Sequence, residues 1–221
     1  MEVSLVAENV FYSVGSKDIL SGATIRADQG KITGLLGRNG SGKTTLLQCI
    51  FGAKKADECD VFFNNKKVRN PYTINGLLNY LPQKPFLPPG ILVRDLVKDF
   101  GIDKDISLEH FPEMEAVLSK SVAQLSGGME RLISVLIILL ADALFCFLDE
   151  PFSHIVPLHI EKIKQVILIQ KRHKGIIIAD HMHTHLLDIS DQVYLLKEGK
   201  SILINDRNNL SLHGYLPQSL D

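Results

Sequence analysis

The sequence feature that most restricts the fold is the segment GRNGSGKT at residues 37–44. It matches the pattern G-x-x-x-x-G-K-[ST] at every required position. The apolar run at residues 32–36 predicts a buried strand before it, and residues 45–51 predict a helix after it. Glycines let the backbone turn tightly, and the N–H groups at a helix N-terminus attract anions. The segment therefore predicts a phosphate-binding loop and a bound nucleoside triphosphate.

The side chains of this loop indicate how a triphosphate would be held. Lys43 is expected to reach the β- and γ-phosphates, and the Thr44 hydroxyl is expected to ligate Mg²⁺. The alternative is an ordinary glycine-rich turn, and a chance match to the full pattern has odds on the order of one in a hundred. The residues expected to contact the nucleotide are Gly37, Asn39, Gly40, Ser41, Gly42, Lys43, Thr44 and Thr45.

Composition narrows the class of protein. The 221 residues include 24 Lys and Arg and 25 Asp and Glu, a net charge of −1 that gives no electrostatic basis for binding nucleic acid. Mean hydropathy is +0.10, and the longest apolar run, residues 132–141, is too short to cross a bilayer. The N-terminus lacks a signal-peptide pattern. We therefore expect one soluble, cytosolic domain over residues 1–221.

The rest of the chain alternates strands and helices. Residues 3–36 predict short strands with turns at 14–16 and 28–30. The later elements are expected as strands near 59–63 and 78–81, a helix at 127–140, a strand at 143–148, a helix at 157–174, a strand at 176–179, a short helix, and a hairpin of 192–196 with 200–204. This order predicts an α/β fold: a P-loop NTPase core with a mostly parallel sheet and an N-terminal antiparallel β-subdomain.

The region between the two strand-rich halves is predicted to be a loop followed by helices. Residues 82–89 are rich in proline and predict a loop. Residues 91–100 and 108–118 have helical spacing, with Pro112 as a break. Together with the helix that follows, they predict a helical subdomain at about residues 84–140, inserted in the P-loop core.

A pair of carboxylates, Asp149 and Glu150, follows the apolar run LFCFL at residues 144–148. The end of such a strand lies at the carboxyl edge of a parallel sheet, where open α/β sheets bind ligands. Asp149 is expected to orient Mg²⁺, and Glu150 to polarise the attacking water as a general base. A solvated strand exit has the same appearance, so the interpretation depends on the phosphate loop.

A second glycine segment, LSGG at residues 125–128, precedes the carboxylate pair by about twenty residues. Ser126 can cap the helix that begins here. Gly127 and Gly128 allow a phosphate to approach the helix N-terminus closely. Taken alone, the segment is an ordinary loop; its place between the other two motifs favours phosphate binding.

In this order and spacing, the phosphate loop, Gln83, the LSGG segment, the acidic pair and His181 resemble the ATP-binding-cassette (ABC) proteins over roughly residues 3–204. The resemblance implies ATP and Mg²⁺ as ligands. It implies that Gln83 contacts Mg²⁺ or the lytic water, and that His181 contacts the γ-phosphate. It also implies a head-to-tail dimer, in which each ATP lies between the loop of one subunit and the Ser126–Gly127–Gly128 segment of the other.

The resemblance implies further partners as well. We expect a membrane permease on a separate chain, a homodimer rather than a heterodimer of cassettes, and a peripheral location on the cytoplasmic face of the cell membrane. The permease is expected to dock on the helical insertion, where apolar residues could instead form the core of that subdomain. These residues are Phe86, Leu87, Ile91 and Leu92.

Apart from Thr44, Gln83 and Asp149, the sequence offers few candidate metal ligands. The three cysteines lack the spacing of a metal site, and buried reduced thiols are expected. They are Cys49, Cys59 and Cys146. His183 and His185 lie close to His181, but no acidic or thiol ligand accompanies this cluster, so a surface helix is expected there rather than zinc.

The chain departs from the family pattern at three places. Val14 stands where an aromatic residue usually stacks on adenine, and alternation along the strand makes Tyr12 the expected substitute. Met129 replaces the commoner glutamine after LSGG, a change that we expect to be tolerated. His154 replaces a small residue, and Val156 replaces an aspartate that couples the two sites of the dimer.

The function expected from the sequence is therefore that of the ATP-hydrolysing subunit of an ABC transporter. A single-cassette ATPase that serves a soluble assembly machine, as in iron–sulfur cluster assembly, is an alternative. A nearly inactive ATP-dependent dimer switch is a third interpretation, because the aspartate is absent at Val156.

Overall fold

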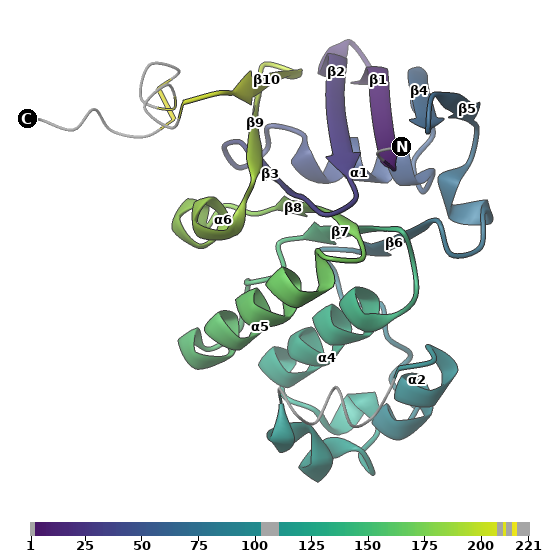
Figure 1. The fold of residues 1–221 in the computed structure, drawn as a ribbon, viewed down its shortest axis with the longest axis vertical. Helices are drawn as coiled ribbons and strands as arrows, with labels where there is room; N and C mark the ends of the chain where they lie inside the picture. The colour runs from purple at the N-terminus through teal and green to yellow at the C-terminus, as the bar shows by residue number, and fades with distance from the viewer. Residues whose placement is uncertain (1–2, 103–110, 207–209, 211–213, 216–221) are drawn as a thin grey trace, which may run out of the picture.

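A computed structural model describes residues 3–102, 111–206, 210, 214 and 215. Figure 1 shows two sheets at one end of the molecule, with helix α1 (Lys43–Phe51) between them, and the longer helices α4 and α5 on the opposite side of the larger sheet. The predicted α/β class is confirmed.

The larger sheet has six strands in the order β10-β9-β3-β8-β7-β6. All neighbouring pairs are parallel except the β9–β10 hairpin at its edge. The bounds are β3 Ile32–Leu36, β6 Leu78–Leu81, β7 Phe145–Asp149, β8 Gly175–Ala179, β9 Gln192–Lys197 and β10 Lys200–Ile204. This order places the ends of β3, β8 and β7 side by side, so the phosphate loop and the acidic pair meet at one edge.

The smaller sheet is antiparallel and has the order β2-β1-β4-β5. Its bounds are β1 Ser4–Val14, β2 Lys17–Asp28, β4 Glu58–Phe63 and β5 Lys66–Val68. The prediction of short N-terminal strands is wrong, since β1 and β2 are 11 and 12 residues long. They bend at bulges instead of ending, because register shifts interrupt their pairing.

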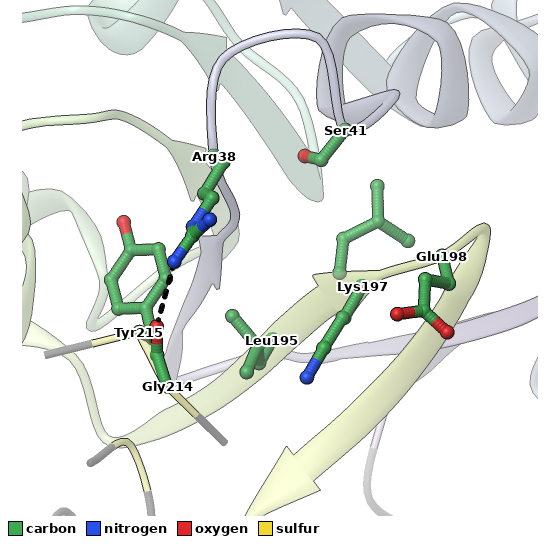
Figure 2. Close-up of a pocket in the computed structure, with 8 residues that line it drawn as sticks. Arg38, Ser41, Leu195, Lys197, Glu198, Gly214 and Tyr215 are labelled. Carbon is green, nitrogen blue, oxygen red and sulfur yellow. Dashed lines mark hydrogen bonds between the residues drawn. The ribbon is translucent and has the colours of Figure 1, made fainter.

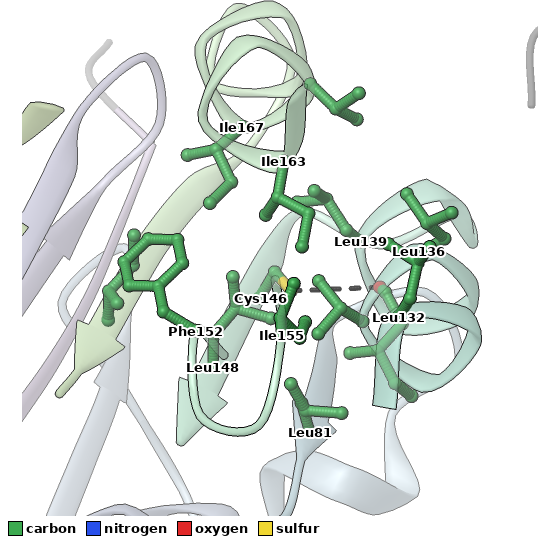
Figure 3. Packing of buried hydrophobic residues seen from close by; sticks show 14 of the residues in the cluster. Leu81, Leu132, Leu136, Leu139, Cys146, Leu148, Phe152, Ile155, Ile163 and Ile167 are labelled. Atoms are coloured by element: carbon green, nitrogen blue, oxygen red, sulfur yellow. Dashed lines mark hydrogen bonds between the residues drawn. The ribbon is translucent and has the colours of Figure 1, made fainter. Parts of the chain in front are cut away.

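The larger sheet separates two apolar cores, because successive strand side chains point to opposite faces. Phe145 and Phe147 of β7 pack towards α1 and the smaller sheet. Cys146 and Leu148 pack towards α4 (Gly127–Leu140) and α5 (Pro157–Gln170). Figure 3 shows this second core, in which the Cys146 thiol donates to the Ile138 carbonyl.

The cysteines follow the prediction in part. All three are free thiols. Cys49 and Cys146 are buried, whereas Cys59 is only partly buried, because β4 lies in the outer sheet.

Between β6 and β7 the chain forms α2 (Val93–Asp99), the 3-10 helices η2 (Pro112–Val117) and η3 (Val122–Gln124), and α4. Figure 1 places α2 at the end of the molecule away from the smaller sheet. The prediction of one helix over 108–118 is wrong for its described part, which is 3-10 and begins at Pro112; residues 108–110 lie outside the described residues. Proline favours the first turn of a helix, so η2 begins where the prediction placed a break.

Several predicted boundaries also shift. Helix α1 begins at Lys43, two residues before its predicted start, and α5 ends at Gln170 rather than 174. Lys174 lies 4% exposed beyond that end. Its ammonium donates to the Leu139 carbonyl at 2.7 Å and to that of Ala141, which satisfies carbonyls at the C-terminus of α4.

Two short helices complete the description. Helix α6 (His183–Ile189) carries His183 and His185, and η1 (Pro71–Thr73) precedes β6. Within the described part of the chain, no helix has the length and apolar character needed to span a membrane.

Candidate nucleotide site

The phosphate loop connects β3 to α1, and its glycines are required by the backbone. Gly40 and Gly42 have φ values of 78° and 102°, in the left-handed region that favours glycine. At Gly37, a Cβ atom would lie 2.9 Å from the Leu196 carbonyl oxygen. At Gly37 the loop therefore passes close to β9, with no space for a side chain.

Lys43 is held inside the loop. Its side chain turns back from the start of α1, and Nζ donates to the carbonyls of Gly37 at 2.8 Å and Arg38 at 3.4 Å. The residue is 6% exposed, and burial lowers the pKa of its ammonium against the opposing effect of nearby carboxylates, Glu150 first. Carbonyls of the loop itself therefore hold the ammonium in place.

Asp149, the last residue of β7, is fully buried beside the loop. The Thr44 hydroxyl donates to its Oδ1 at 3.2 Å, and the Tyr80 hydroxyl donates to its Oδ2 at 3.2 Å. Burial raises the pKa of this carboxyl, and the two hydrogen bonds oppose the rise. Hydroxyl and carboxylate oxygens are the ligands that Mg²⁺ prefers, so Thr44 and Asp149 fit that ion.

Glu150 follows in a strained backbone conformation. Its φ is +51°, and its N–H donates to the Ala179 carbonyl at 2.7 Å. Ser153 Oγ donates to the Glu150 carboxylate at 3.2 Å, and His181 Nδ1 lies 3.8 Å from Oε1. The ends of β7 and β8 thus bring the predicted base and the predicted γ-phosphate contact together.

Asp180, which the sequence interpretation missed, holds the segment that follows β7 and the segment that follows β8. It is fully buried, and its carboxylate accepts from the N–H groups of Met182 at 2.8 Å and Phe152 at 3.3 Å. Burial raises the pKa of its carboxyl. The available signal was its position directly after an apolar strand, as with Asp149.

A cleft of about 520 Å³ gathers most of the predicted residues. Gly37 and Asp149 do not line it, although Asp149 accepts a hydrogen bond from Thr44, which does. The lining is Tyr12, Val14, Ile19, Asn39, Gly40, Ser41, Gly42, Lys43, Thr44, Thr45, Lys54, Gln83, Glu150 and His181.

Tyr12 and Val14 both line this cleft, as alternation along β1 requires. Lys54, which follows α1, also lines it, and its Nζ lies 4.9 Å from the centroid of the Tyr12 ring. No sequence pattern pointed to Lys54. The role of Tyr12 as the adenine contact stays a prediction.

The LSGG segment lies elsewhere. Ser126 caps α4 by accepting from the Met129 N–H at 3.3 Å. Gly127 and Gly128 line a separate cavity of about 300 Å³, and Gln83 lines both this cavity and the nucleotide cleft. Within one chain, the predicted phosphate contacts of this segment are therefore not in the cleft.

Arg131 is the second important residue that the sequence interpretation missed. It is 8% exposed in α4 and donates to the Pro82 carbonyl at 2.7 Å, to that of Glu150 at 3.0 Å and to that of Asp149. Burial lowers the pKa of its guanidinium, and the nearby carboxylates, Asp149 first, oppose this. A single arginine in an apolar helical run was the available signal.

Another cavity, of about 330 Å³, lies beside the phosphate loop (Figure 2). Leu195–Glu198 of the β9–β10 hairpin, Arg38 and Tyr215 line it, and Arg38 donates to the Gly214 carbonyl at 3.0 Å. Ser41 of the phosphate loop lines both this cavity and the nucleotide cleft. Among the described residues, no group of three or more His, Cys, Asp or Glu side chains is arranged to hold a metal ion.

A phosphate loop between a central strand and α1, facing an acidic pair at the end of a parallel strand, defines a P-loop nucleoside triphosphatase. Comparison with known proteins gives the family. The family model described as ABC transporter matches residues 20–153. The chain therefore belongs to the ABC transporter family and is one of its ATPases.

Individual relatives agree with this assignment. The lipopolysaccharide export system ATP-binding protein LptB of Haemophilus influenzae is 28% identical over 90% of this chain and 88% of its own. The probable branched-chain amino acid transport ATP-binding protein LivF of Archaeoglobus fulgidus is 31% identical over 82% and 83%. A solved ATP-binding subunit of an ABC transporter, 22% identical, has a TM-score of 0.81 over 96% of this chain and 93% of that one, which supports the fold.

Proposed function

We propose that this chain binds and hydrolyses ATP and energises a separate membrane permease through ATP-driven closure of a cassette dimer. The observation that carries the proposal is the cleft that phosphate-loop residues share with Glu150, His181 and Gln83. Membership of the ABC family supports ATP as the nucleotide.

The residues of the chain have separate tasks in this reaction. Lys43 and the N–H groups of the loop bind the phosphates, which positions the γ-phosphate and stabilises its charge. Glu150 polarises the attacking water, and its own orientation is fixed by the Ser153 hydroxyl. His181 contacts the γ-phosphate from the end of β8, at 3.8 Å from the Glu150 carboxylate.

Thr44, Asp149 and Gln83 would hold Mg²⁺ in this proposal. The Thr44 hydroxyl already faces the Asp149 carboxylate, and Gln83 lines the same cleft. When bound, the ion neutralises charge on the phosphate oxygens. Tyr80 keeps the second oxygen of Asp149 hydrogen-bonded, so the carboxylate keeps one orientation.

A second cassette supplies the remaining contacts. Ser126 and Gly127 are exposed at the N-terminus of α4, outside the cleft of their own chain. A helix N-terminus with a serine cap and glycines suits a phosphate, so we propose that these residues meet the nucleotide of the partner subunit. A homodimer provides this arrangement twice by symmetry.

The permease is proposed to contact the helical region between β6 and β7, which would place the complex on the cytoplasmic face of the cell membrane. Phe86 is 37% exposed, whereas Leu87 is buried at 7%. Of the four predicted docking residues, Leu87 therefore contributes to the core and Phe86 offers apolar surface.

A nearly inactive dimer switch is the second candidate, and one observation favours it. Val156 is 55% exposed before α5, and His154 has a φ of +64°. An exposed valine cannot make the hydrogen bonds of the aspartate that it replaces.

The test is affinity purification of the tagged full chain from its own cells in mild detergent. Co-purification of a polytopic membrane protein, together with ATP hydrolysis by the complex, supports the transporter subunit. A membrane partner without hydrolysis supports the switch. Soluble partners alone contradict both and favour a soluble assembly ATPase.

A further inference from the structure

Tyr215 contacts the phosphate loop from outside the nucleotide cleft, and the proposed mechanism gives it no task. It lines the cavity of about 330 Å³ beside the loop, together with Gly214 and Arg38. The Tyr215 N–H donates to the carbonyl of the fully buried Leu210 at 2.9 Å. Its ring packs against the apolar core on the α4 and α5 side of the larger sheet. The fold therefore sets the position of this side chain.

Two hydrogen bonds connect Gly214 and Tyr215 to the start of the phosphate loop. The Gly214 carbonyl accepts from the Arg38 guanidinium at 3.0 Å, a bond that Figure 2 shows. Burial raises the pKa of the Tyr215 hydroxyl, and a hydrogen bond with the Gly37 backbone opposes the rise. The carbonyls of Gly37 and Arg38 also accept from Lys43. The same two loop residues are thus held by Lys43 and by the segment that contains Tyr215.

The same tyrosine contacts the segment that follows β8. The rings of Tyr215 and His183 are arranged edge to face, with centroids 6.3 Å apart and an interplanar angle of 85°. The His183 N–H donates to the His181 carbonyl at 2.9 Å. The charge of the buried Asp180 carboxylate also raises the pKa of the Tyr215 hydroxyl. Tyr215 therefore contacts both the phosphate loop and the turn that carries His181.

The separation of these two segments determines which phosphates they can contact together. The pairing of β3 with β8 ends at Leu35 and Ala179, so the loop and the His181 turn both lie beyond it. In the proposed reaction, the loop and Lys43 bind the phosphates of ATP and ADP alike, whereas His181 contacts only the γ-phosphate. A hydrogen bond weakens steeply when its atoms are displaced by about 1 Å. The γ-phosphate contact would therefore depend on what holds the turn next to the loop.

We propose that Tyr215 is a positioning residue, which holds the phosphate loop and the His181 turn at the separation that lets both contact the γ-phosphate. The inference rests on the proposed function, in which His181 makes that contact. Tyr215 acts without touching the nucleotide, since it does not line the cleft. Loss of its ring should therefore weaken the binding of ATP more than the binding of ADP.

The test measures the dissociation constants of ADP and of the non-hydrolysable imidodiphosphate analogue of ATP by calorimetry, with Mg²⁺, for the full chain. Tyr215→Leu should reduce the preference for the ATP analogue over ADP by about tenfold, the effect of one hydrogen bond to a charged group. Tyr215→Phe keeps the ring and loses the hydroxyl, so it should reduce the preference by less. Tyr72→Leu is the matched control, because Tyr72 is 50% exposed and lines neither the cleft nor the cavity beside the loop.

A double-mutant cycle with His181→Ala distinguishes positioning from a general loss of stability. His181→Ala alone should reduce the preference for the ATP analogue. Once His181 is removed, Tyr215→Leu should change the preference no further. A reduction of equal size in both backgrounds would show that Tyr215 acts independently of His181, which overturns the inference.

The outcomes also separate this inference from the proposed function. A preference that falls in Tyr215→Leu only when His181 is present, and that stays unchanged in Tyr72→Leu, supports the inference. An unchanged preference in both Tyr215 variants overturns the inference and leaves the proposed function intact. If Tyr215→Leu does not fold, the cycle is measured with Tyr215→Phe and is read in the same way. Failure of the wild-type chain to bind the ATP analogue overturns both.

Discussion

The nucleotide cleft and the LSGG segment of the same chain are built in opposite ways. On the cleft side, Lys43, Asp149 and Asp180 are almost wholly buried and each makes at least two hydrogen bonds within the chain. On the other side, Ser126 and Gly127 are exposed, and Ser126 has one side-chain hydrogen bond, to the Met129 N–H. The cleft is preorganised by the core, whereas the LSGG segment presents its groups outwards.

This difference indicates which parts of the reaction one chain can supply. In the proposed reaction, phosphate binding and orientation of the water would depend on groups that the fold already holds. Completion of the site would depend on a second surface. Variants on the cleft side should therefore act on the isolated chain, and those on the exposed side should act on the dimer.

The largest effect is expected from Glu150→Gln. Loss of the general base should reduce ATP turnover roughly a hundredfold to ten-thousandfold, because general base catalysis contributes about that much. Steady-state phosphate release measures the turnover. ATP affinity should be retained, and equal turnover in the variant would remove Glu150 from this role.

Lys43→Ala tests the preorganised cation directly. The loss of charge-assisted hydrogen bonds to the phosphates should reduce ATP affinity by about a hundredfold or more. Equilibrium binding of labelled ATP is the measurement, and Lys55→Ala, an exposed lysine after α1, is the control. Unchanged affinity would contradict the placement of the phosphates in the loop.

Arg131→Met tests how far the cleft depends on α4. The variant leaves the carbonyls of Pro82, Asp149 and Glu150 without their buried donor, which should cost about 2–3 kcal/mol of unfolding free energy. Urea denaturation measures it. Arg94→Met on α2, where the side chain is 62% exposed, should change stability little. Equal stability of the two variants would show that Arg131 does not hold these segments together.

Val156→Asp changes an exposed residue that does not line the cleft. Restoring the aspartate should raise ATPase activity severalfold at protein concentrations that favour dimers and have no effect in dilute solution. Leu158→Asp, at a neighbouring side chain that is 68% exposed, is the control for added charge. A variant with wild-type activity would mean that this departure is harmless.

The smallest effect concerns the link between η2 and α5. Glu113 accepts from Lys162 at 3.1 Å and lies 2.8 Å from His159 Nε2. Burial raises the pKa of Glu113, but its hydrogen bonds, then the charges of Lys162 and His159, outweigh this and leave the pKa lowered. The carboxylate therefore stabilises the fold above its unfolded pKa, and this contribution is lost as the pH falls through the folded pKa.

Glu113→Gln should accordingly cost up to about 1 kcal/mol at neutral pH, as for a partly exposed ion pair, and nothing in acid. Thermal unfolding as a function of pH measures the difference. Glu115→Gln, on the exposed side of the same 3-10 helix, is the control. A difference that persists below the carboxyl pKa would show that the ion pair is not its source.

The parts of the structure that could be predicted from the sequence are those with local causes. The glycines and Lys43 specify the phosphate loop, and the apolar runs before the loop and before Asp149 specify central strands. The α/β class and the family followed from these motifs. The roles assigned to individual site residues stay predictions.

The parts that could not be predicted depend on distant contacts. Arg131 and Asp180 act through backbone groups of other segments, which no local pattern identifies. Lys54 reaches Tyr12 from 42 positions away along the chain, a separation that only the packing of α1 against the smaller sheet closes. Residues 112–117 form a 3-10 helix that begins at Pro112, although the apolar spacing is that of an α-helix.

The buried ammonium of Lys174 has a consequence for the order of folding. The carbonyls that it satisfies, at the end of α4, precede it by 35 and 33 residues. During synthesis, α4 emerges before the lysine that completes it, and its last turn lacks these bonds until the chain has passed through β7 and α5. The carbonyls at the end of the helix that carries the LSGG segment therefore receive these two hydrogen bonds only after the segment just before β8 has been synthesised.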